Sequence, residues 1–140
     1  MDPVAILYPG IAMFFLTFSM VVYLGYNRFT AIRRRDVSIG YYRLYDRGEQ
    51  PERLALLGRH VQNHFEVPPI FYAALLFTFV SGAVNPFSVS LAWLFVLSRC
   101  VHSYIHLGSN NVTRRFVTFI TGGLILTGIW TSLLVSLLRA

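Results

Sequence analysis

The sequence predicts an all-α integral membrane protein, a four-helix bundle formed by a single domain, residues 1–140. Hydrophobic residues make up 55% of the chain and charged residues only 13%, whereas about a quarter of the residues of a soluble domain are charged. The apolar residues fall in long blocks with the charges gathered between them, and no strand-like alternation is present. This is the pattern of a chain whose helices cross a bilayer.

Four apolar stretches define the expected spans, at residues 4–26, 64–84, 88–107 and 116–138. Each holds about 20 residues or more, and at about 1.5 Å of rise per residue each helix can cross about 30 Å of hydrocarbon. The first stretch has no basic leader and no small-residue cleavage site, so we expect a retained span. We expect the second helix to begin in the cytoplasm near Pro51 and to bend near Pro68 and Pro69, where prolines remove amide donors.

The placement of the basic residues, all twelve of which are arginines, predicts the orientation of the chain. Eight lie in the long connection 27–63: Arg28, Arg33, Arg34, Arg35, Arg43, Arg47, Arg53 and Arg59. Arg114 and Arg115 lie in the short connection before the fourth stretch. Because these connections share one side, the positive-inside rule places both in the cytoplasm and both termini on the non-cytoplasmic side. The membrane thus accounts for the basic charge without a nucleic-acid partner, and the absence of lysine favours a bacterial inner membrane.

Two polar faces are expected on neighbouring antiparallel helices near the cytoplasmic side. They are Arg59, Asn63 and Glu66, spaced i, i+4 and i+7, and Arg99, His102 and His106, spaced i, i+3 and i+7. In one hypothesis, Glu66 and Arg99 form a buried ion pair that fixes helix packing. In the other, the arginines outnumber the available carboxylate and bind an anionic ligand, because guanidinium groups match carboxylates in a bidentate fork.

The four histidines raise a metal or haem protein as an alternative function, since His60 and His64, like His102 and His106, are spaced i, i+4 on a helix. However, His60 and His64 point about 100° away from the face that carries Arg59. The two sets therefore do not line one groove well, and we predict no metal ligands. The single cysteine, Cys100, lies in an apolar stretch and is expected to pack inertly, with no disulfide partner in the chain.

Two motifs resemble those of the MAPEG family, the membrane-associated proteins in eicosanoid and glutathione metabolism. The stretch from Arg59 to Pro69 resembles that family's R-x-x-x-N-x-x-E-x-x-P motif. The run from Ser98 to His102, followed by Leu107-Gly108 and Arg114-Arg115, resembles its third span and the start of its fourth. The resemblance covers essentially the whole chain.

The resemblance implies a homotrimer that binds glutathione between neighbouring subunits, on the cytoplasmic side. Its implied activity is a glutathione transferase or peroxidase reaction with a lipophilic small molecule taken from membrane lipid, with isomerisation as a further form. A non-catalytic lipid-binding role, which some members have, is an alternative. By local alignment the resemblance implies that Arg115 stabilises the thiolate, with the neighbouring Arg114 as the alternative. The other implied glutathione-binding residues are Arg28, Arg59, Asn63, Glu66, Arg99 and His102.

Four positions depart from the prostaglandin-synthase members of the family, whose residue order is otherwise nearest. Gln62 stands in place of an arginine, and His106 in place of a tyrosine. Phe116 and Phe119 stand in place of a serine and a tyrosine that follow the catalytic arginine. The loss of these hydroxyl groups argues against an eicosanoid isomerase and leaves glutathione binding untouched.

Overall fold

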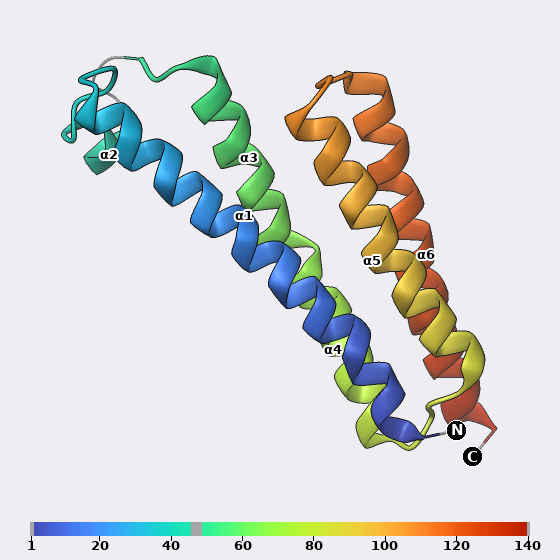
Figure 1. The fold of residues 1–140 in the computed structure, drawn as a ribbon. Coiled ribbons are helices and arrows are strands. Elements are labelled where there is room, and N and C mark those ends of the chain that lie inside the picture. The colour runs from blue at the N-terminus through green and yellow to red at the C-terminus, as the bar shows by residue number, and fades with distance from the viewer. Residues whose placement is uncertain (1, 46–48, 140) are drawn as a thin grey trace.

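The computed structural model describes residues 2–45 and 49–139, and within these ranges every regular element is a helix (Figure 1). Arg47, counted above among the basic residues, lies outside the described residues. A short 3₁₀ turn, Pro3–Ile6, leads into the first helix. The helices are α1 (Leu7–Arg33), α2 (Tyr41–Leu44), α3 (Glu52–Glu66), α4 (Pro68–Val80), α5 (Pro86–Leu107) and α6 (Val112–Leu138).

The second predicted span corresponds to two helices rather than one. α3 ends at Glu66, and α4 begins at Pro68 directly after Val67. Pro68 and Pro69 lack the amide hydrogens that would continue the ladder of hydrogen bonds, which confirms the predicted bend. Three helical stretches are long and apolar enough to cross a membrane unaided, Pro3–Arg33, Pro86–Leu107 and Val112–Leu138. α4 is too short for this with 13 residues, and it reaches the length of the bundle only together with α3 (Figure 1).

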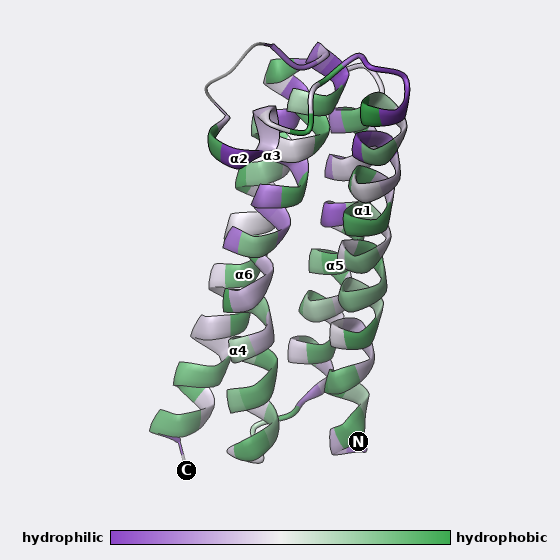
Figure 2. Cartoon of the chain, turned by 90° about the vertical axis from the view of Figure 1, so that its left-hand side faces the viewer, coloured by the Kyte–Doolittle hydropathy of each residue, from purple (hydrophilic) through white to green (hydrophobic). Residues whose placement is uncertain are grey.

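Four long helical segments, α1, α3 with α4, α5 and α6, form a bundle. Its polar and apolar residues lie in separate parts. The two termini and the turn between α4 and α5 lie at one end, and the connections that follow α1 and α5 lie at the other (Figure 1). Hydrophilic residues gather at this second end, around α2 and the start of α3, whereas the rest of the bundle is largely hydrophobic (Figure 2). A bilayer requires this division, because its hydrocarbon solvates no charges.

A stacked pair of phenylalanines joins α4 to α5 in the middle of the bundle, where α5 packs along α6. Phe71 and Phe95 are fully buried and stack with their ring centroids 4.3 Å apart. Ala74, which follows Phe71 on α4, and Ala92, which precedes Phe95 on α5, are also fully buried. Dispersion contacts such as this stacked pair, rather than the hydrophobic effect, stabilise helix packing in a membrane.

Candidate functional site

A cavity of about 270 Å³ brings together three of the predicted site residues. Asn63 of α3, His102 of α5 and Arg115 of α6 all line it. Val112, Phe116 and Phe119 provide the rest of its α6 wall. We call this the thiol cavity, after the thiol that Arg115 is expected to stabilise from the resemblance drawn above. It combines a cation, an amide and an imidazole with an aromatic surface. The polar groups can bind an anionic ligand, and the aromatic surface can hold an apolar group next to it.

The start of α6 positions the Arg115 guanidinium. The Asn111 side chain caps the helix by accepting a hydrogen bond of 3.0 Å from the amide of Arg114. Asn110, in the left-handed backbone region at φ 48°, accepts a hydrogen bond of 2.7 Å from Arg115 Nη1. Arg115 Nε is buried without a partner in the described chain, and Arg114 is exposed. Arg115 is therefore the arginine held at the thiol cavity, close to the positive end of the α6 dipole.

Arg28 and Arg59 line a different cavity, of about 660 Å³, together with Gln62. The Arg28 guanidinium carbon lies 5.1 Å from the centroid of the Tyr42 ring, a cation–π distance. Burial raises the pKa of the Tyr42 hydroxyl, while the positive charge of Arg28 opposes this shift. The phenol is therefore protonated at neutral pH. This cavity, which we call the arginine cavity, is separate from the thiol cavity within one chain.

Glu66 and Arg99 do not form the ion pair considered as one hypothesis. Glu66 is exposed and accepts a hydrogen bond of 3.0 Å from Gln62 Nε2. Arg99 is buried, and its Nη2 donates to the backbone carbonyls of Thr118 and Phe119 at 2.9 and 3.4 Å. The guanidinium thus ties α5 to α6 through backbone acceptors. In this position it supports the α6 wall of the thiol cavity rather than lining it.

The close approach of Arg99 to α6 requires a glycine at position 122. A Cβ atom added at Gly122 would overlap the Arg99 guanidinium, whereas one added at Gly123 has open space around it. We expect Gly122→Ala to displace the guanidinium from its carbonyls and to cost about 2 kcal/mol of stability. Gly123→Ala, the matched control, is expected to be neutral or slightly stabilising. Thermal unfolding in detergent measures both, and equal unfolding temperatures would contradict this role for Gly122.

The histidines occupy the interior between α3 and α5. His60, His64, His102 and His106 are each no more than 5% exposed. The ring centroids of His60, His102 and His106 are 4.7 to 6.0 Å apart, so the histidine pairs reach one depth. His102 Nδ1 lies 3.0 Å from Thr118 Oγ1, which orients its ring beside the thiol cavity. The face that carries Arg59 and Glu66 is instead exposed. The two faces of α3 diverge as predicted, and the histidine face is the one directed inward.

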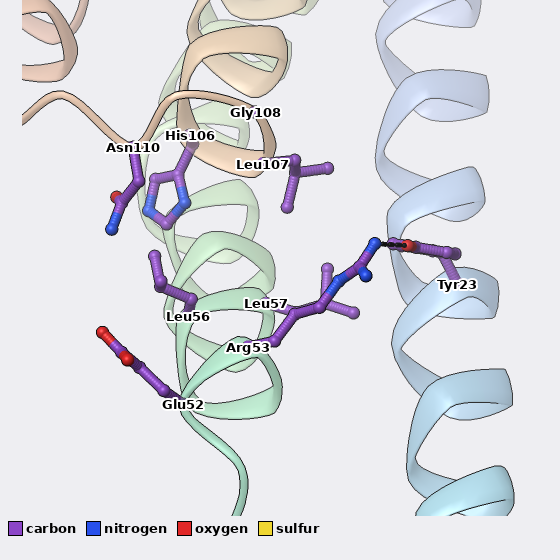
Figure 3. Close-up of a pocket in the computed structure, with 9 residues that line it drawn as sticks. All are labelled: Tyr23, Glu52, Arg53, Leu56, Leu57, His106, Leu107, Gly108 and Asn110. Carbon is purple, nitrogen blue, oxygen red and sulfur yellow. Dashed lines mark hydrogen bonds between the residues drawn. The ribbon is translucent and has the colours of Figure 1, made fainter.

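A third cavity, of about 330 Å³, was not predicted from the sequence. Its lining comes from α1, α3 and the end of α5, where the His106 ring lies beside Asn110 and Leu56, above Glu52 (Figure 3). Arg53 Nη2 donates a hydrogen bond of 3.1 Å to the Tyr23 hydroxyl across it. No sequence motif marks this cavity, because its walls come from three separate segments. Cys100 is also exposed rather than packed inside the bundle, which corrects its expected environment.

The fold and the cavities define a helical membrane protein with arginine-lined cavities at the polar end of its bundle. The sequence model of the MAPEG family matches residues 6–135. The chain therefore belongs to the MAPEG family, which confirms the resemblance drawn from the two motifs. A comparison with curated proteins found no match. Membership of this family makes the chain an integral membrane protein with a role related to glutathione.

Proposed function

We propose that this protein is a membrane-bound glutathione-dependent transferase or peroxidase, in which Arg115 ionises the glutathione thiol. The observation that carries the proposal is the thiol cavity, where Arg115, Asn63 and His102 converge beside two phenylalanines. A free thiol has a pKa of about 8.5 and is mostly protonated at neutral pH. A nearby guanidinium stabilises the thiolate by charge and by hydrogen bonding.

The tripeptide is proposed to be held by two subunits of a homotrimer. Asn63, His102 and Arg115 supply one half of the site from the thiol cavity. Arg28 and Arg59 supply the other half from the arginine cavity of the neighbouring subunit. The carboxylates of glutathione pair with these arginines, and the exposed Glu66 pairs with its amine. Arg99 supports the α6 wall of the thiol cavity, and Arg114 adds positive charge at the start of α6.

The second substrate is proposed to be a lipophilic electrophile or peroxide that enters sideways from the bilayer. Phe116 and Phe119 provide an apolar surface next to the proposed position of the sulfur. Neither side chain carries a hydroxyl, so the thiolate depends on charge rather than on a hydroxyl donor. Membrane residence concentrates such a substrate at the site. We place the arginine-rich end in the cytoplasm of a bacterial inner membrane, with both termini on the opposite side.

The test is glutathione binding to the detergent-purified protein, measured by calorimetry and followed by turnover with an aromatic electrophile and a lipid hydroperoxide. We expect saturable binding and product formation with at least one of the two substrates. Arg139→Leu is the matched control, because Arg139 follows α6 at the opposite end of the bundle. It is expected to leave both measurements unchanged. Failure of the wild-type protein to bind glutathione would refute the proposal, and binding without turnover would favour the non-catalytic alternative.

A further inference from the structure

The third cavity, which the proposed function does not use, is formed within one chain. Its lining residues come from α1, α3, the end of α5 and the turn that follows α5. Its volume of about 330 Å³ is at the small end of the range of about 300 to 1,000 Å³ that is typical of ligand pockets. The cavity therefore has room for a small organic molecule and not for a whole phospholipid.

A buried histidine without hydrogen bonds lines this cavity. His106 is 1% exposed, and both of its ring nitrogens are buried without a partner in the described chain. Figure 3 shows its ring beside Asn110 at the cavity. Buried polar atoms in native proteins almost always have a partner, and an unpaired one costs stability. Because the ring holds no hydrogen bond, it can turn toward a ligand without breaking one.

Three further side chains offer hydrogen-bond donors to the same cavity. The side-chain oxygen of Asn110 accepts a hydrogen bond of 2.7 Å from Arg115 Nη1, which leaves the NH₂ group of this amide to donate elsewhere. On the other side of the cavity, Arg53 Nη2 donates to the Tyr23 hydroxyl at 3.1 Å (Figure 3). This contact uses the hydroxyl as an acceptor, so its own hydrogen remains available, as do the other guanidinium hydrogens. The lining is therefore rich in donors.

The charges around the cavity favour an anion over a cation. Arg53 supplies one positive charge to the lining, and Arg115 adds another behind Asn110. Glu52 is the carboxylate among the described lining residues. It is exposed and lies in the first turn of α3, where the positive end of the helix dipole offsets its charge and dissolved salt screens it. A ligand carboxylate also matches a guanidinium group in geometry as well as in charge.

We propose that the third cavity binds a small organic carboxylate that carries a hydroxyl group at its other end. The carboxylate pairs with Arg53 and accepts a hydrogen bond from the Tyr23 hydroxyl. The ligand hydroxyl bonds to Asn110 and His106, because a hydroxyl both donates and accepts and so suits a neutral imidazole in either tautomer. The apolar body of the ligand lies against the leucines of the lining, Leu56, Leu57 and Leu107.

The test is equilibrium dialysis of the detergent-purified wild-type protein with para-hydroxybenzoate and, separately, with omega-hydroxyhexanoate, against detergent alone. We expect at least one of them to bind saturably at one site per chain, with a Kd below about 1 mM. Benzoate and hexanoate lack the hydroxyl, and para-hydroxybenzamide lacks the charge. Each is expected to bind about 10-fold more weakly than the compound it matches.

Three outcomes would overturn the proposal. The first is the absence of saturable binding of both hydroxylated carboxylates. The second is equal binding of the compounds that lack the hydroxyl, and the third is equal binding of the uncharged amide. The measurements contain no glutathione, so their failure and the failure of the proposed function are distinguishable.

Variants of two lining residues locate the site. Arg53→Gln is expected to weaken the binding of para-hydroxybenzoate by roughly 10-fold to 100-fold. Arg43→Gln is the matched control, because Arg43 is an exposed arginine of α2 that does not line the third cavity. It is expected to leave the affinity unchanged. An equal loss in both variants would show attraction to surface charge and overturn the assignment.

His106→Phe separates recognition of the ligand hydroxyl from support of the fold. It is expected to weaken the binding of para-hydroxybenzoate by about 10-fold and to leave benzoate binding unchanged. A general loss of structure would weaken both. Circular dichroism verifies that each variant is helical, and Arg53→Gln at an exposed position keeps the test independent of His106→Phe. Wild-type affinity for para-hydroxybenzoate in folded His106→Phe protein would contradict the role of this histidine.

Discussion

Arg115→Leu is expected to lower the turnover of glutathione by about 10-fold to 100-fold at neutral pH, with glutathione still bound. An opposite charge close to an ionisable group lowers its pKa by about 1 to 3 units, and the variant removes that charge from the thiol cavity. The pKa of the bound thiol then returns toward about 8.5. The thiolate absorbance of the complex at neutral pH, together with the rate of conjugation, measures both effects.

The pH profile separates loss of thiolate from loss of structure. In our proposal the thiol bound to the wild-type protein has a lowered pKa, so activity is expected to rise with pH below neutrality. In Arg115→Leu that rise moves to higher pH, and part of the activity returns above the pKa of the free thiol. Arg114→Leu is expected to have a smaller effect, because Arg114 is exposed and Arg115 is half-buried against Asn110. An unchanged thiolate absorbance in Arg115→Leu would contradict the assignment of this residue.

The fold was largely predictable because the bilayer imposes simple rules on helices. Pro68 and Pro69 predicted the break between α3 and α4 from their missing amide hydrogens. The ends of the helices were less predictable. α1 continues to Arg33, well beyond the predicted span, and α6 begins at Val112. Hydropathy marks where a helix enters the hydrocarbon, whereas capping groups such as Asn111 determine where the helix itself begins and ends.

The site was only partly predictable, because helical spacing gives the face of a residue and not its partner. Helical spacing placed Arg99 on one face with His102. The groups that accept hydrogen bonds from Arg99 are backbone carbonyls of α6, and no residue type in the sequence indicates which backbone carbonyls are used. Spacing also showed that His60 and Arg59 diverge. It could not show which of the two faces inward, since that depends on the packing of α3 against α5. The third cavity was missed for the same reason.

Co-expression of two variants that are each nearly inactive is expected to recover activity if the site is shared between subunits. Within one chain, Arg59 lines the arginine cavity and Arg115 lines the thiol cavity. One glutathione that uses both groups therefore draws them from adjacent subunits in our proposal. Arg59→Leu and Arg115→Leu should each reduce turnover strongly when expressed alone. In a cyclic trimer that contains both variants, one of the three interfaces carries both native arginines.

When the two variants assemble at random in equal amounts, about three quarters of the cyclic trimers contain both variants. Each mixed trimer has one intact site in three. The expected activity is therefore about one quarter of the wild-type activity. The measurement is turnover of the co-expressed variants, with differently tagged subunits purified in sequence to isolate mixed assemblies. Mixing the separately purified variants after assembly is the control and is expected to stay inactive. If co-expression yields no activity above that of either variant alone, Arg59 and Arg115 do not act across an interface, and the shared-site arrangement is wrong.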